Sequence, residues 1–197
     1  MKRTLLATAV GFAALSAAPA IAEPVPYVLD SSHSQSIFSY DHLGFSTTYG
    51  MFSGFEGEIM FDQENPENSS VSVSMPVTMM FTGWEKRDEH FMSADFFDAA
   101  ATEETEMVTF TSTSIEVTGE DTANITGDLT LNGITKPVTL AARLNKTGEH
   151  PMQNKEWAGF DATTTLVRSE FDVGRAAPFV GDEVNVLISI EAQRADS

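Results

Sequence analysis

The stretch that decides the fold reads NITGDLTLNGITKPVTLAARL and covers residues 124–144. Apolar and polar side chains alternate on both sides of its centre, which is the pattern of a β-strand with one apolar face. Asn132-Gly133 stands at the centre, and this dipeptide favours a two-residue turn between antiparallel strands. The stretch therefore predicts a β-hairpin with strands over 124–131 and 134–144.

The same alternation continues on both sides of this hairpin. Apolar residues take the odd positions from Val71 to Phe81 and the even positions from Val184 to Ala192. Such rows place one face of each strand toward the core and the other toward water. The expected strands cover residues 37–42, 49–61, 71–81, 107–117, 124–131, 134–144, 157–168 and the segment from 184 onward. This count of eight predicts an all-β fold.

Antiparallel strands in this number form either a closed barrel or a two-layer sandwich. Gly50, Gly54 and Gly57 follow one another along the strand expected over 49–61. Glycines spaced along a strand permit the bends and bulges that closure requires. We therefore expect an eight-stranded antiparallel barrel, whose interior has room for one small ligand.

One segment, residues 84–97, departs from the alternation. Its apolar residues Phe91, Ala94 and Phe97 are spaced three apart, as on one side of a helix. The segment predicts a short helix that covers an open end of the barrel, near its mouth.

Composition and charge exclude several functions. The chain has 197 residues, 42% of them hydrophobic, and its net charge is −18, from 29 acidic and 11 basic residues. A nucleic-acid backbone requires a basic surface, so we expect no nucleic-acid partner. The absence of cysteine excludes disulfides, a thiol nucleophile and cysteine-type zinc sites.

Residues 1–22 have the three parts of a secretory signal peptide. Lys2 and Arg3 precede an uncharged apolar run over 5–18, and Ala20-Ile21-Ala22 gives a small-x-small cleavage pattern. The run is shorter than the roughly 20 residues needed to span a bilayer. We expect residues 23–197 to form one domain without a transmembrane segment, exported to a bacterial periplasm, where a domain without disulfides depends on its core alone.

Several of these motifs, taken in order, resemble the YceI-like family of lipocalin-like, polyisoprenoid-binding bacterial proteins. Asp30 with Ser32-His33-Ser34, the run RDEHFMSADFFD at 87–98 and the hairpin GDLTLNGITKPV at 127–138 carry the resemblance. It implies an extended lipocalin-like barrel around an apolar pocket that holds a polyprenyl chain, a quinone tail or a fatty-acyl amide. It implies no catalysis and no cofactor other than this bound lipid.

An apolar tunnel also suits the composition, since the chain contains 14 phenylalanines and nine methionines. Flexible methionines adapt to an irregular ligand, and phenylalanines supply broad apolar walls. Strand alternation and the segment near the mouth select the residues expected to face the ligand. These are Phe38, Tyr40, His42, Met79, Phe81, His90, Phe91, Phe97, Phe110 and Arg168.

Arg168 is the most specific candidate among them. It continues the even-numbered apolar row of 157–168 and is therefore expected to point inward. A buried guanidinium needs an acceptor. Two interpretations stay open: an ion pair with Asp88 or Asp95, or contact with a ligand pyrophosphate or quinone oxygen.

Two rival functions also stay open. In one, His42 and His90 face each other at the mouth as ligands of a metal or haem. Alternatively, phenylalanine and methionine fill the barrel, and the protein has a structural or stress role without a ligand. The sequence contains neither a GxSxG motif nor a phosphate-binding glycine loop, so we do not expect an enzyme. Exposed Leu187 is a candidate contact for a homodimer.

Overall fold

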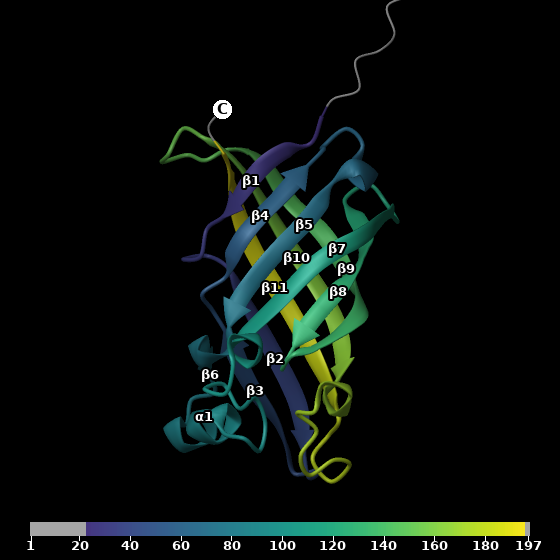
Figure 1. Cartoon of the computed structure of the whole chain (residues 1–197). Helices are drawn as coiled ribbons and strands as arrows, with labels where there is room; N and C mark the ends of the chain where they lie inside the picture. Colours follow the sequence, from purple (N-terminus) through teal and green to yellow (C-terminus); the bar gives the residue numbers. More distant parts are fainter. Residues whose placement is uncertain (1–22, 196–197) are drawn as a thin grey trace, which may run out of the picture.

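The computed structural model describes residues 23–195, and the expected signal peptide lies outside this range. All strands belong to one antiparallel sheet (Figure 1). The strands are β1 (Val25–Leu29), β2 (Gln35–His42), β3 (Ser46–Phe52), β4 (Glu56–Phe61), β5 (Ser70–Pro76), β6 (Met80–Phe81), β7 (Met107–Val117), β8 (Thr122–Leu131), β9 (Ile134–Glu149), β10 (Glu156–Val167) and β11 (Glu183–Arg194). Two helices, α1 (Glu85–Met92) and α2 (Glu103–Glu106), lie between β6 and β7.

The sheet closes into an eight-stranded barrel in the order β1-β4-β5-β7-β8-β9-β10-β11 and back to β1. The remaining strands β2, β3 and β6 extend this barrel downward in Figure 1. Strand β11 joins both parts, because Ala192–Arg194 pairs with β1 and Asn185–Ser189 pairs with β2. The predicted barrel is confirmed. Two of its expected strands, 49–61 and 71–81, are interrupted, and the predictions missed β1.

Each interruption has a local cause. Gly54, with φ of +73°, separates β3 from β4, and a 3₁₀ turn at Val77–Met79 separates β5 from β6. The turn around His33 separates β1 from β2, where Asp30 N donates to Glu191 O at 2.9 Å. These bends let the eight strands of the upper part close into a barrel. In the lower part, β2, β3 and β6 extend the sheet and do not close a second ring.

The lower half is covered by the connection between β6 and β7 (Figure 1). The predicted helix over 84–97 is shorter than expected, since α1 ends at Met92. Ser93 terminates it, because its extended backbone leaves the helix while its N–H and hydroxyl both donate to His90 O. Phe91 and Phe97 nevertheless pack inward against aromatic rings of β2 and β3.

The hairpin at 124–144 forms as predicted. Leu131 pairs with Ile134, and Asn132 and Gly133 both have positive φ, as a two-residue primed turn requires. The amide of Asn132 also donates to Phe171 O at 3.1 Å, which ties this turn to the loop over 168–182.

Buried apolar residues gather in two clusters rather than one. The lower cluster includes Phe38, Phe52 and Phe171, and the upper one includes Tyr27, Ile59 and Phe61. No helix in the part of the chain that the structure describes is both long and apolar enough to cross a bilayer.

Candidate functional site

A cavity of about 800 Å³ runs through the barrel. Its lower end is bordered by α1 and the loop over 168–182, and its upper end by the turn between β7 and β8. Every strand of the barrel except β1 contributes to its wall. The wall residues are mostly apolar and include Phe38, Phe52, Phe61, Val73, Met75, Phe110, Leu140, Phe160, Val186 and Ile190. The interior is therefore hollow, as expected, and the alternative of a barrel filled by its own phenylalanines and methionines is not supported.

Strand alternation builds this wall. On β11 the even positions Val184, Val186, Ile188 and Ile190 line the cavity, and Leu187 between them is 45% exposed on the outer surface. Alternation on β10 follows the same rule, since Phe160, Ala162, Thr164 and Leu166 face inward. Exposed Leu187 remains only a candidate dimer contact.

The cavity is widened by small residues from three neighbouring strands. Ala123 of β8 pairs with Ala142 of β9, which pairs with Ala162 of β10, and all three line the cavity. A methyl side chain fills far less of the lumen than the phenylalanines on the opposite wall. This row of three alanines therefore leaves the space that a hydrocarbon chain would occupy.

Eight of the ten predicted residues line this cavity. They are Phe38, Tyr40, His42, His90, Phe91, Phe97, Phe110 and Arg168. The inward orientation predicted for Met79 and Phe81 is wrong, because their side chains are 49% and 61% exposed. The three residues of the 3₁₀ turn at Val77–Met79 do not alternate between the two faces as strand residues do. After the turn the even-numbered residue therefore points inward, and Met80 is buried.

The predictions missed several large wall residues. Phe52, Phe55, Phe61 and Phe171 all line the cavity and are nearly inaccessible to solvent. Phe52 and Phe61 lie at the ends of β3 and β4, on either side of the Gly54 bend. A sequence pattern read as one unbroken strand could not tell on which side of this bend each ring would lie.

Arg168 is buried as predicted. Of the two interpretations, the ion pair with Asp88 or Asp95 is wrong, and contact with a ligand oxygen stays a prediction. The guanidinium donates to four backbone carbonyls, at 2.8 Å to Gly181 and Val173 and at 2.9 Å to Arg175 and Val180. Burial lowers the pKa of Arg168, and Asp182 opposes this shift through its negative charge. The side chain therefore organises the loop over 168–182 at the lower mouth.

The two expected acid partners make other contacts. Asp95 accepts from Arg175 and lies 3.1 Å from His90 Nε2, and Asp88 accepts from the N–H and the hydroxyl of Thr82. The Arg175–Asp95 ion pair joins the loop over 168–182 to the segment that follows α1. Two covers of the lower mouth are thus connected.

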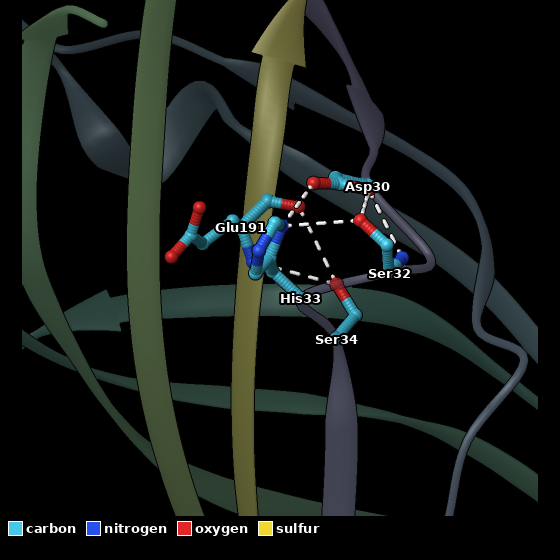
Figure 2. A network of polar contacts seen from close by, with 5 residues as sticks. All are labelled: Asp30, Ser32, His33, Ser34 and Glu191. Carbon is cyan, nitrogen blue, oxygen red and sulfur yellow. Dashed lines mark hydrogen bonds and ion pairs between the residues drawn. The ribbon is translucent and has the colours of Figure 1, made fainter. Parts of the chain in front are cut away.

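The predicted His42 and His90 metal or haem site is not supported. Both side chains line the cavity, but within residues 23–195 the three metal-ligating groups that converge are Asp30, His33 and Glu191. Figure 2 shows this cluster at the junction of β1, β2 and β11. It contains neither His42 nor His90.

Direct hydrogen bonds join Asp30, Ser32 and His33 in this cluster (Figure 2). His33 Nδ1 lies 2.6 Å from Asp30 Oδ2, and the Ser32 hydroxyl donates to Asp30 Oδ1 at 2.7 Å. The bond to Asp30 raises the pKa of His33. Desolvation alone would raise the pKa of Asp30, but hydrogen bonds from His33 and Ser32 outweigh it and lower that pKa. The cluster stabilises the turn between β1 and β2.

Comparisons with known proteins agree with this architecture. A family model described as the YceI-like domain matches residues 27–192. A UPF0312 protein of Ectopseudomonas mendocina is 39% identical over 196 residues, covering 98% of this chain and 99% of that protein.

Solved structures give the same fold. The crystal structure of BcnA from Burkholderia cenocepacia superposes with a TM-score of 0.74 at 24% identity, over 83% of this chain and 99% of BcnA. A polyisoprenoid-binding domain from Saccharophagus degradans gives 0.63 at 14% identity, over 87% of this chain and 99% of that domain. The chain belongs to the YceI-like family.

Proposed function

We propose that this protein binds and carries a long-chain amphiphile, such as a polyisoprenoid or prenyl quinone, with its tail in the barrel cavity. The observation that carries the proposal is the continuous apolar cavity of about 800 Å³. The polyisoprenoid-binding domain from Saccharophagus degradans, which has the same fold, supports this ligand class. A long flexible tail suits a long narrow lumen better than a compact ligand does.

Burial of the tail supplies enough free energy for binding. Removing about 400 Å² of prenyl surface from water at ~25 cal/mol per Å² offers roughly 10 kcal/mol before ordering costs are subtracted. The wall therefore needs no strong polar contact along the tail. Polar contacts are needed only where the head group leaves the cavity.

The lower mouth is the better position for that head group. His42, Trp84 and His90 line the cavity there, and Trp84 is 59% exposed. Side chains with an apolar body and a polar atom suit a boundary between hydrocarbon and water. We place the head group beside α1.

The cellular setting follows from the expected signal peptide, and we propose that the carrier works in the periplasm. A soluble carrier there would move or store a lipid between two membranes. We propose binding without catalysis, in keeping with the mostly apolar wall of the cavity.

Solvent extraction of the protein from its native host, followed by mass spectrometry, tests the proposal. A prenyl or acyl lipid recovered in near-stoichiometric amount is the expected result. A parallel titration with a prenyl quinone covers the case in which the native lipid is lost during purification. Recovery of no lipid together with no uptake of added quinone would overturn the carrier function.

A further inference from the structure

Large apolar side chains are exposed on two loops at the lower end of the molecule (Figure 1). Phe45, in the turn between β2 and β3, is 90% exposed, and Phe179, in the loop over 168–182, is 77% exposed. Leu43, in the same turn as Phe45, is also exposed. Single exposed apolar residues are common on soluble proteins, so the arrangement of these three decides whether they form a binding surface.

Backbone contacts join the two loops into one unit. A β-bridge pairs His42 with Val180, and Gly181 N donates to Asp41 O at 2.9 Å. A Cβ atom added at Gly181 would lie 3.2 Å from three atoms of Asp41, so the two loops are in close contact. The three exposed side chains on this unit form what we call the tip surface: Leu43, Phe45 and Phe179.

Hydrogen bonds fix the backbone beside each phenylalanine of the tip surface. In the first loop, Phe45 N donates to His42 O at 3.0 Å. In the second loop, Arg168 donates to the carbonyl of Val180, the residue after Phe179, at 2.9 Å. The backbone is therefore held in a conformation that keeps both rings outside the barrel.

The turn between β2 and β3 carries an apolar residue where folding favours a different type. Leu43 has a φ of +60°, and Gly44 after it has a φ of +73°. A left-handed backbone suits Gly, Asn or Asp, and a leucine in this conformation costs stability. Leu43 gains little burial in return, because it is 48% exposed. Folding alone therefore does not account for this leucine, which points to a contact with another molecule.

The tip surface adjoins the wall of the cavity. His42 and Ser46, which flank the exposed residues of the first loop, line the cavity. Ala176 and Val180 of the second loop line it as well. A hydrocarbon tail that leaves the lumen at this end therefore emerges beside the tip surface.

The charge around the tip surface does not favour an anionic partner. The whole chain has a net charge of −18, and α1, which also borders the lower mouth, has three acidic and two basic residues. Anionic lipid surfaces attract clusters of Lys and Arg, so a neutral surface fits this end better. Four of the six charged residues in the two loops are acidic: Asp41, Arg168, Glu170, Asp172, Arg175 and Asp182.

From these observations we infer that the tip surface inserts into a zwitterionic phospholipid membrane and holds the lower mouth against it, so that a tail passes between bilayer and lumen without crossing water. This inference rests on the proposed carrier function. Apolar side chains that enter the boundary between head groups and acyl chains anchor a protein through the area they bury. A stable protein partner would need about 800 Å² on each side, more than three side chains supply.

Flotation of the full-length processed protein, free of ligand, with phosphatidylcholine vesicles tests the inference. We expect the protein to float with the vesicles and its tryptophan fluorescence to shift to the blue. Of the two tryptophans, Trp84 is exposed and lines the lower mouth, whereas Trp157 is buried, so the shift reports the mouth. Replacing about a third of the lipid with phosphatidylglycerol should weaken binding, because this end of the protein is not basic.

Variants assign docking to the tip surface. Phe45→Ser and Phe179→Ser should each lower the vesicle partition coefficient about fivefold, and the double variant about 20-fold, because each change removes apolar area from the bilayer. Leu43→Asn should weaken docking without loss of stability, since asparagine tolerates a positive φ. Met152→Ser is the matched control, because Met152 is 82% exposed in the turn between β9 and β10, at the opposite end, and should not change docking. Thermal unfolding checks that each variant is folded.

A titration with farnesol, without vesicles, separates docking from the carrier function. If farnesol binds but the protein does not float with vesicles, or the parent and the double variant float equally, docking is overturned and the carrier function stands. Self-association of the parent protein in sedimentation velocity that Phe45→Ser abolishes also overturns docking, because a second copy would then cover the tip surface. Absence of farnesol binding overturns the carrier function and, with it, the passage of a tail from the bilayer.

Discussion

The ring of Phe38 lies directly over Gly50, its cross-strand partner on β3. A Cβ atom added at Gly50 would lie 2.2 Å from Cζ of Phe38, closer than any non-bonded contact allows. The Phe38 ring is also held from the sides, since its centroid lies 5.3 Å from that of Phe52 and 6.5 Å from that of Tyr40. The absent side chain at Gly50 thus lets a large ring lie flat against the wall and leaves the lumen open.

Gly50→Ala should therefore destabilise the protein by about 1–3 kcal/mol, because the added methyl group forces the Phe38 ring into an off-rotamer position or into the cavity. Urea unfolding followed by tryptophan fluorescence measures this change. Gly159→Ala is the matched control, since its nearest contact would be Ile190 O at an ordinary 3.9 Å. A loss as large for Gly159→Ala as for Gly50→Ala would contradict the steric explanation.

Arg168 gives a second prediction about stability. Arg168→Lys keeps the charge, but a single ammonium group cannot serve four carbonyls arranged around a planar guanidinium. We expect a loss of about 2–4 kcal/mol, because buried carbonyls of the loop over 168–182 lose their donors. Arg143→Lys, at a position whose side chain bonds only to nearby Asn145, should change stability by less than about 0.5 kcal/mol. Equal unfolding midpoints for the two variants would show that Arg168 does not organise the loop.

The Asp30–His33 pair predicts a pH window of stabilisation. The pKa of Asp30 is lowered from 3.8, so its contribution is present above that value and is lost as pH falls through the folded-state pKa. The pKa of His33 is raised from 6.5, so its contribution is present below that value and is lost as pH rises through the folded-state pKa. The Tm difference between the parent protein and His33→Gln should be largest between these two values and should shrink on both sides. A difference that stays constant from pH 3 to pH 9 would exclude this ion pair as its source.

The sequence predicted the barrel well because the features that determine it are local. Alternation on β9, β10 and β11 and the turn at Asn132-Gly133 are properties of neighbouring residues, and the structure confirms them. The predictions failed where tertiary structure interrupts a strand. Met79 and Phe81 continue the apolar row of 71–81 in sequence, but the 3₁₀ turn at Val77–Met79 reverses their direction.

The partners of Arg168 were also beyond the reach of sequence patterns. Its inward direction follows from parity, and burial confirms it. Its acceptors are backbone carbonyls of residues 173–181, and every residue type carries such a carbonyl. Only the folded path of this loop shows that the carbonyls converge on one guanidinium. An argument from side-chain charge therefore selected Asp88 and Asp95 wrongly.

The row of small side chains across the cavity wall allows the carrier function to be tested without disturbing the mouth. Ala142 lines the cavity, and its neighbour Ala141 on the same strand is exposed and takes no part in the wall. Ala142→Phe should place a ring in the lumen, beside Ala123 and Ala162, and should weaken binding of a prenyl ligand at least tenfold. Ala141→Phe adds the same ring on the outer surface and should leave binding unchanged.

Titration of both variants with farnesol measures the effect, and thermal unfolding checks that each is folded. The reason for the difference is volume: a phenyl ring occupies space that the hydrocarbon tail would otherwise fill, and a close-packed wall cannot move aside to restore it. Since farnesol is added in solution, this result is independent of the tip surface and of any membrane. If the two variants bind farnesol equally well, the tail does not occupy the lumen beside β8, β9 and β10.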